Sequence, residues 1–190
     1  MNYKKLGKII GLSLVIVIIA AVLGFSIAFY DVMGFNAKES QTLNPDGTVV
    51  GNAMVVYDPG ITGTAKKVAD SIAKDLQAKG YRVELAGISS SKADNISDYS
   101  VIVVGGPIYD GNASSSVNEY LKNLKISQNT SLGVFASGMD PDSDKDNVTL
   151  LKEAAPLPEN SDLQIKAVMK VVNGNIDNNA INNFVNKLLQ

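Results

Sequence analysis

Residues 53–76 constrain the fold more than any other part of this chain. They begin with a short apolar run, Ala53–Tyr57, which is typical of a buried β-strand. A loop rich in Gly and Thr follows, and the apolar residues then take up a helical period: Ala65, Val68, Ala69, Ile72, Ala73 and Leu76. A strand, a hydroxyl-rich loop and a helix in this order gather free N–H groups and the positive end of a helix dipole, which suits a phosphate group. A simple Gly/Thr turn that caps a helix gives the same pattern.

The rest of the chain repeats this alternation of strand and helix. Five strands alternating with helices predict an α/β three-layer sandwich, a parallel sheet with helices on both faces, and the strand order 2-1-3-4-5 fits this count. Ligands of such sheets bind at the carboxyl ends of the strands. The expected strands are 53–57, 81–85, 100–104, 132–136 and 164–172, and the expected helices are about 63–79, 116–124, 147–155 and a last one capped by Asp177.

An uncharged apolar run over residues 9–30 precedes this region. As a helix it is about 30 Å long, which is the thickness of a bilayer core. A cleaved signal peptide is the competing interpretation, but its apolar region is shorter and ends in a small-residue cleavage site. Here the run closes with Phe29 and Tyr30, an aromatic pair typical of a membrane interface. We therefore predict a retained membrane-spanning helix.

The charges that flank the run predict its orientation. Lys4, Lys5 and Lys8 precede it, and Lys38 is the one basic residue in the next twenty positions. The positive-inside rule then places the N-terminus in the cytoplasm and the rest of the protein outside, at the cell membrane. The predicted organisation is a cytoplasmic segment 1–8, a transmembrane helix 9–30, a polar tether 31–52 and one domain over 53–190.

Composition excludes several classes of protein. The chain has no Cys and no His, so thiol chemistry, most zinc sites and His-based catalytic triads are absent. One Arg among 17 basic residues and a net charge of −2 argue against nucleic-acid binding. Alternating acids at Asp140, Asp142, Asp144 and Asp146 resemble part of a calcium loop, but Lys145 and Leu151 stand where an EF-hand has Gly and Glu. We interpret this segment as a solvated acidic loop, and we expect no metal site.

Two loops carry a family resemblance. The first reads Val-Val-Tyr-Asp-Pro-Gly-Ile-Thr-Gly-Thr-Ala-Lys-Lys-Val-Ala, and the second reads Val-Ile-Val-Val-Gly-Gly-Pro-Ile-Tyr-Asp-Gly. Both resemble flavodoxins, especially the flavodoxin-like branch that includes menaquinone-dependent protoporphyrinogen oxidase. The resemblance implies a flavodoxin-like fold that binds FMN. It also implies that the first loop holds the FMN phosphate with hydroxyls and amides, over Gly60, Ile61, Thr62, Gly63, Thr64 and Ala65.

The resemblance also assigns residues near the flavin ring. In the second loop it implies Gly106, Pro107, Ile108, Tyr109 and Gly111, with Tyr109 stacked on the ring and Gly105 and Gly106 allowing a close backbone approach. In the third loop it implies Ser137 and Gly138. The sequence departs from the family pattern in three ways: Gly60 and Ala65 lack expected hydroxyls, and no aromatic residue lies between Phe135 and Phe184 to cover the second face of the ring.

Two functions are consistent with these features. The first is a membrane-tethered flavodoxin-like protein that uses FMN to transfer electrons, as a carrier or an FMN-dependent oxidoreductase, with a membrane redox partner such as a quinone. The second is an extracytoplasmic module that keeps the fold but has lost FMN and serves in binding or structure. Gly60 and Ala65 favour the second function, whereas Thr62 and Thr64 favour the first. No set of residues indicates a hydrolase or a transferase.

Overall fold

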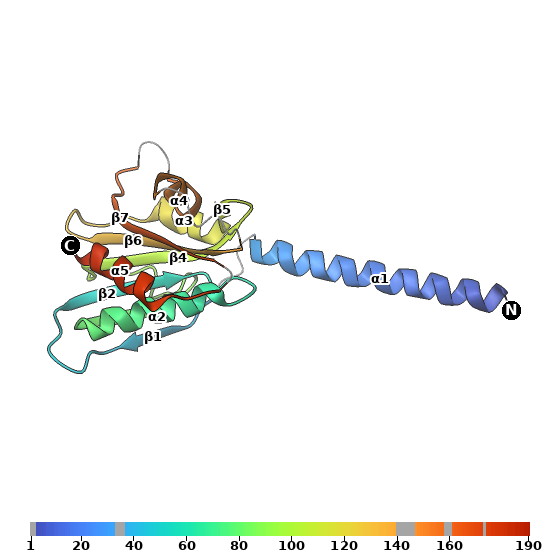
Figure 1. Ribbon diagram of the computed structural model, residues 1–190, viewed down its shortest axis with the longest axis horizontal. Coiled ribbons are helices and arrows are strands. Elements are labelled where there is room, and N and C mark those ends of the chain that lie inside the picture. The colour runs from blue at the N-terminus through green and yellow to red at the C-terminus, as the bar shows by residue number, and fades with distance from the viewer. Residues whose placement is uncertain (1–2, 33–36, 140–146, 158–160, 173) are drawn as a thin grey trace.

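A mostly parallel sheet forms the centre of the domain. The computed structural model describes residues 3–32, 37–139, 147–157, 161–172 and 174–190 (Figure 1). The seven strands lie in the order β1-β3-β2-β4-β6-β7, with β5 paired to β4 alone. The five strands β3-β2-β4-β6-β7 are parallel and follow the predicted order 2-1-3-4-5, but the sheet differs from the predicted five-stranded one by the antiparallel edge strand β1 and the short β5. The strands are β1 (Ser40–Leu43), β2 (Gly51–Tyr57), β3 (Tyr81–Gly87), β4 (Val101–Tyr109), β5 (Asn112–Ala113), β6 (Ser131–Gly138) and β7 (Ile165–Val172).

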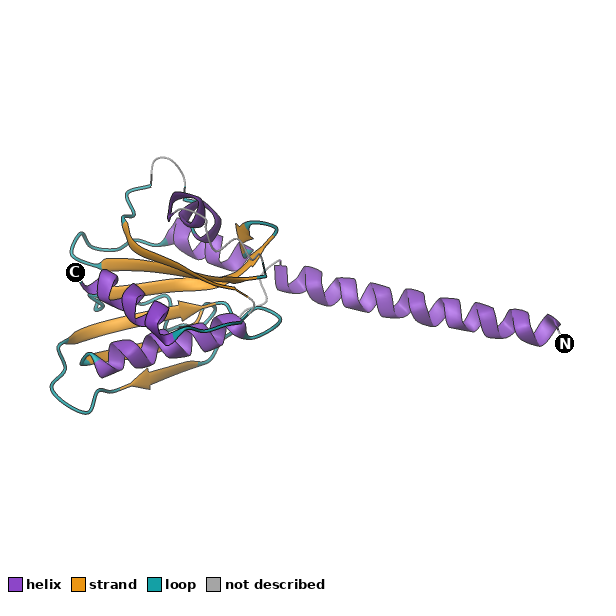
Figure 2. Cartoon of the chain, in the orientation of Figure 1, coloured by secondary structure: helices purple, strands orange, loops and turns teal. Residues whose placement is uncertain are grey.

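Helices cover both faces of this sheet, so the predicted three-layer sandwich is confirmed (Figure 2). Helices α2 (Thr64–Ala78) and α5 (Asn178–Leu189) pack against one face, and α3 (Ser115–Asn123) and α4 (Asn147–Ala154) pack against the other. Successive residues of β2 alternate between the two cores. Val55 and Tyr57 belong to the first core, and Met54 and Val56 belong to the second. A strand buried on both faces is therefore apolar throughout, as its sequence shows.

The long N-terminal helix α1 (Tyr3–Val32) projects away from the sandwich (Figure 1). Its segment Lys8–Ile27 has a mean hydropathy of 2.8, and none of it is buried against the protein. Within the described part of the chain, this is the one helix long and apolar enough to cross a membrane. A signal sequence near an N-terminus has the same properties.

The predicted tether over 31–52 needs correction. Strand β1 lies inside it and pairs antiparallel with β3, from Ser40 opposite Ala86 to Leu43 opposite Val83. No hydrophobic period marks this segment because β1 is an edge strand, exposed at its first three residues. Its side chains therefore do not alternate between a buried and an exposed face, so no pattern in the sequence reveals the strand. Part of the tether belongs to the domain.

A tight hairpin at the end of β4 was also unexpected. β4 continues to Tyr109, where the sequence analysis placed a loop, and β5 turns back so that Tyr109 pairs with Asn112. The two residues between them, Asp110 and Gly111, have φ values of 49° and 74°. Positive φ at both central positions is the requirement of a type I′ turn, for which Asp-Gly is a favoured sequence. The hairpin holds Tyr109 on a strand rather than on a free loop.

Candidate functional site

A pocket opens at the carboxyl edge of the sheet, where α2 begins. Its volume is 850 Å³, which is within the range of small-molecule sites. Nine of the thirteen residues predicted for the cofactor line it: Ile61, Thr62, Thr64, Pro107, Ile108, Tyr109, Gly111, Ser137 and Gly138. It is also lined by Asp110, Met139, Lys170 and Gly174, which the sequence analysis did not single out.

The loop between β2 and α2 supplies the polar end of the pocket. The Thr62 hydroxyl donates to the Thr64 hydroxyl at 3.0 Å, and it accepts the Thr64 N–H at 3.3 Å. Helix α2 begins after Gly63, which has a φ of 66°. Glycine has no side chain, so no side chain caps the helix at this position. Among the described residues, none accepts a hydrogen bond from the next two amides of the first turn, those of Ala65 and Lys66. Two hydroxyls and open amides at a helix N-terminus are groups that bind phosphate.

The two missing hydroxyls have structural explanations. Gly60 has a φ of 62°, and a Cβ at this position lies 3.0 Å from Cγ of Pro107. A serine at position 60 is therefore strained, as the positive φ implies. Ala65 is fully buried in the core beside α2. Gly60, Gly63 and Ala65 do not border the pocket with their side chains, and their predicted contact with the cofactor through backbone N–H groups stays a prediction.

Two glycines in β4 allow close packing within the protein. A Cβ on Gly105 lies 2.3 Å from the backbone oxygen of Phe135 on the neighbouring strand. A Cβ on Gly106 lies 2.7 Å from Cγ2 of Val117 on α3 and 2.9 Å from Cβ of Asp58. Gly106 does not border the pocket, and its predicted place beside the ring stays a prediction. Both glycines let other elements of the protein approach β4 closely.

Tyr109 lies on the apolar wall of the pocket. Its side chain is partly buried, and its phenolic oxygen is shielded from solvent without a hydrogen-bond partner among the described residues. Ile61 and Met139 also line the pocket and are 55% and 82% exposed, so aliphatic side chains stand at its rim. A buried hydroxyl without a partner is uncommon in folded proteins, and it indicates a group that a ligand can satisfy.

Lys170 contributes the one ammonium group on the described part of the pocket wall. It extends from β7, its side chain is 6% exposed, and its Nζ lies 3.4 Å from Oε2 of Glu153 on α4. Sequence reasoning missed this residue because it lies in an apolar strand. A lysine near the carboxyl end of a buried strand was the available signal, since lysine is rarely buried unless paired. The four acids of the possible calcium loop, residues 140, 142, 144 and 146, lie outside the described residues.

A buried carboxylate supports the pocket from beneath. Asp58 directly follows β2 and is fully buried, and it accepts hydrogen bonds from the Gly60 N–H at 3.1 Å, the Ser114 hydroxyl at 2.7 Å and the Ser116 hydroxyl. Ser114 is the N-cap position of α3, so Ser116 lies inside the first turn of the helix rather than at its cap. The Ser116 side chain bonds Asp58 instead. Asp58 thus joins the loop before α2 to the start of α3.

Asp58→Ala is expected to lower the free energy of unfolding by about 2–4 kcal/mol, because it removes the charged acceptor and leaves its buried donors without a partner. Asp70→Ala is the control. Asp70 forms an i,i+4 pair with Lys66 at 3.1 Å on a half-exposed helix face, and it is expected to cost less than about 1 kcal/mol. Urea unfolding followed by circular dichroism compares the two variants. Equal losses at the two positions are the result that contradicts a supporting role for Asp58.

Comparison with known proteins decides the family. The sequence model of the flavodoxin domain family matches residues 55–189. This chain belongs to the flavodoxin family. A search of the curated proteins finds no significant match. The likeness to the branch with menaquinone-dependent protoporphyrinogen oxidase is not tested by these comparisons and stays a prediction.

Solved structures support the same fold. A short-chain flavodoxin associated with a non-canonical PDU bacterial microcompartment is 18% identical, with a TM-score of 0.50, and the match covers 74% of this chain and 97% of that one. A flavo di-iron protein from Thermotoga maritima is 19% identical, with a TM-score of 0.51, over 77% of this chain and 36% of that one. A flavodoxin from Streptococcus pneumoniae is 16% identical, with a TM-score of 0.49, over 73% of this chain and 97% of that one. At these identities the likeness of the first two structures shows the fold.

Family membership supports FMN as the cofactor, and a flavodoxin fold suggests electron transfer. The residues of this chain fit FMN. Thr62, Thr64 and the first-turn amides of α2 suit its phosphate, and the pocket beside them is large enough for a flavin ring. The Tyr109 hydroxyl has no hydrogen-bond partner among the described residues, and a bound ligand would explain why it is buried.

Proposed function

We propose that this protein is a membrane-anchored flavodoxin that transfers electrons through FMN. The observation that carries the proposal is the arrangement of one pocket, with the Thr62 and Thr64 hydroxyls at one end, beside the N-terminus of α2, and the Tyr109 wall at the other. Both ends lie at the carboxyl edge of a parallel sheet, where ligands of such sheets bind. Bound FMN supplies the electron chemistry, and the protein supplies binding, orientation and electrostatics.

Each part of the pocket has a role in this proposal. Thr62, Thr64 and the amides of Ala65 and Lys66 hold the phosphate. Tyr109 provides a flat apolar surface for the ring, and it loses little torsional freedom when it does so. Asp58 fixes the loop that carries the phosphate donors. The Lys170 ammonium places a positive charge on the pocket wall, which favours a ligand that gains negative charge.

The apolar helix α1 is the basis for the proposed membrane location. It is exposed along Lys8–Ile27, so it is not a core helix of the sandwich. Retained in the membrane with Lys4, Lys5 and Lys8 in the cytoplasm, it places the flavodoxin domain outside. The electron partner we propose is a membrane redox carrier, such as a quinone.

A protease accessibility experiment tests this topology. Protease added to intact cells is expected to degrade the domain, because the domain lies outside and three lysines lie on the cytoplasmic side. The membrane fraction is probed after digestion with an antibody against the C-terminus. Degradation that occurs only after lysis reverses the orientation.

The visible spectrum of the purified protein tests the cofactor. The full chain, extracted from membranes in detergent, is expected to be yellow and to show the flavin absorption bands. Protein that is colourless and stays so after incubation with FMN contradicts the proposal.

One observation favours the alternative, a module that has lost FMN. No hydroxyl side chain enters the pocket from Gly60 or Ala65, and the rim residue after β6 is the aliphatic Met139 rather than an aromatic. In that case the pocket or its rim serves in binding without a flavin. The colourless result described above is the outcome that this alternative predicts.

A further inference from the structure

The segment that follows the apolar helix is built into the flavodoxin domain. Strand β1 lies along the edge of the sheet on β3, and its Thr42 hydroxyl donates to Oε2 of Glu84 at 2.7 Å. Glu84 is 7% exposed, so it depends on this donor for its carboxylate. Leu43 also packs against the core beside α2. Strand β1 is therefore fixed to the domain rather than free to swing.

The residues just before β1 are fixed at the carboxyl edge of the sheet. Ala37 is 7% exposed, and its carbonyl accepts the Ser89 N–H at 3.0 Å. The Glu39 carbonyl accepts the Gly87 N–H at 2.8 Å. Gly87 is the last residue of β3, and a Cβ on it lies 2.4 Å from the Ala37 oxygen. The close approach of Ala37 thus requires glycine at the end of β3.

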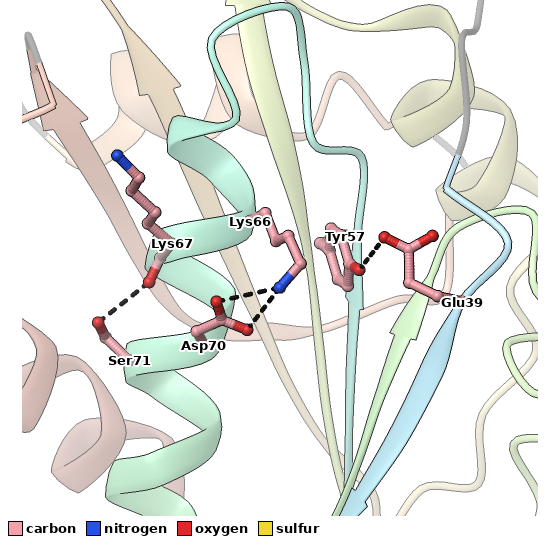
Figure 3. Close-up of polar contacts among 6 residues, drawn as sticks. All are labelled: Glu39, Tyr57, Lys66, Lys67, Asp70 and Ser71. Atoms are coloured by element: carbon pink, nitrogen blue, oxygen red, sulfur yellow. Dashed lines mark hydrogen bonds and ion pairs between the residues drawn. The ribbon is translucent and has the colours of Figure 1, made fainter.

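A side-chain cluster ties the same segment to the start of the FMN loop (Figure 3). The hydroxyl of Tyr57, the last residue of β2, donates to Oε1 of Glu39 at 3.0 Å. Burial, followed by the contact with Glu39, raises the pKa of Tyr57, so the hydroxyl keeps its proton. Lys66 lies over the Tyr57 ring at 5.7 Å and pairs with Asp70. Glu39 therefore contacts the strand end from which the phosphate loop departs.

The connection to the membrane helix is short. Helix α1 ends at Val32, and five peptide steps lead to Ala37. Fully extended, they span at most about 18 Å. The seven residues of β2 rise about 23 Å, so the opposite edge of the sheet lies farther from Ala37 than the connection can reach. In Figure 1, α1 meets the domain at the edge where α2 begins and β5 lies.

We propose that the mouth of the FMN pocket faces the bilayer that holds α1, with Ile61 and Met139 in contact with the lipid headgroup region. These two side chains are 55% and 82% exposed, and both line the pocket. Apolar side chains at a membrane surface are stabilised by partial burial in the headgroup region. The inference rests on the proposed anchor and cofactor. It restricts the electron partner to one that reaches the pocket from the membrane side.

Site-specific labels test this orientation. The chain has no Cys, so a single introduced cysteine carries the label alone. Ile61→Cys and Met139→Cys report on the pocket rim. Val49→Cys is the matched control, because Val49 is 50% exposed and precedes β2 at the opposite edge. Each full-length variant is labelled with a fluorophore and reconstituted into phosphatidylcholine vesicles that contain nitroxide-labelled lipid.

Quenching by the nitroxide lipid is expected to be at least about threefold greater at positions 61 and 139 than at position 49, because a sheet height separates the two edges. Equal quenching at the three positions, or greater quenching at position 49, overturns the proposed orientation. Vesicle flotation and the flavin absorption of the Val49→Cys protein are measured on the same samples. Failure of the anchor or of FMN binding is thereby seen independently of the orientation.

Discussion

Gly105→Ala is expected to lower the free energy of unfolding by about 3 kcal/mol or more. Gly105 lies in the middle of the sheet and pairs with Phe135 on β6. The new Cβ stands 2.3 Å from the Phe135 backbone oxygen and 2.4 Å from its ring. Neither atom can move away without separating β4 from β6, so the whole sheet is strained. Chemical unfolding of the full chain in detergent, followed by circular dichroism, measures the loss.

Gly138→Ala is the control for this prediction. Gly138 lies at the end of β6, the strand next to β4. A Cβ on Gly138 has Cε of Lys170 as its nearest neighbour at 3.4 Å, which is an ordinary contact with a flexible side chain. Its φ is not positive, so alanine is not strained there. We expect a change of less than about 1 kcal/mol. A similar loss in both variants means that the spacing between β4 and β6 does not depend on glycine at position 105.

Tyr109→Ala is expected to weaken FMN binding by about 1–3 kcal/mol, which is roughly fivefold to 150-fold in affinity. The physical reason is the loss of a large apolar surface that the β4–β5 hairpin holds in place. Titration of the full chain with FMN, followed by quenching of flavin fluorescence, gives the affinity.

Tyr109→Phe separates the ring from its hydroxyl. It keeps the flat surface and removes an oxygen that has no partner among the described residues. Affinity is expected to fall by less than in Tyr109→Ala, because the flat surface is kept and only one hydrogen bond to the ligand is lost. Unchanged affinity in Tyr109→Ala places the ring away from Tyr109 and contradicts its assigned role.

The central sheet was predictable from the sequence because its strands are buried on both faces. β2 and β4 read as continuous Val- and Ile-rich runs, and their pairing in a parallel sheet follows from that composition. The edge strand β1 has a polar sequence, Ser-Gln-Thr-Leu, and takes its stability from pairing with β3. Such pairing is long-range, so a local pattern does not reveal it.

The site was predicted in part for a similar reason. Thr62, Thr64 and Tyr109 lie in motifs that the sequence shows directly. The packing role of Gly106 was missed because a sequence does not show which atoms a glycine lets approach, and here they belong to Asp58 and Val117. Asp58 and Lys170 were missed because their surroundings come from distant segments: α3 supplies the serines on Asp58, and β7 brings Lys170 to the pocket.

Comparison of FMN with riboflavin tests the central claim most directly. The two ligands share the ring and differ by the phosphate that Thr62, Thr64 and the α2 amides are expected to hold. Each hydrogen bond to a charged group contributes about 1.5–3 kcal/mol, so the full chain is expected to bind FMN at least about tenfold more tightly than riboflavin. Titration of the purified chain with each ligand under the same conditions measures this ratio. Equal affinity for the two ligands, or no binding of FMN, contradicts a flavodoxin site in this pocket.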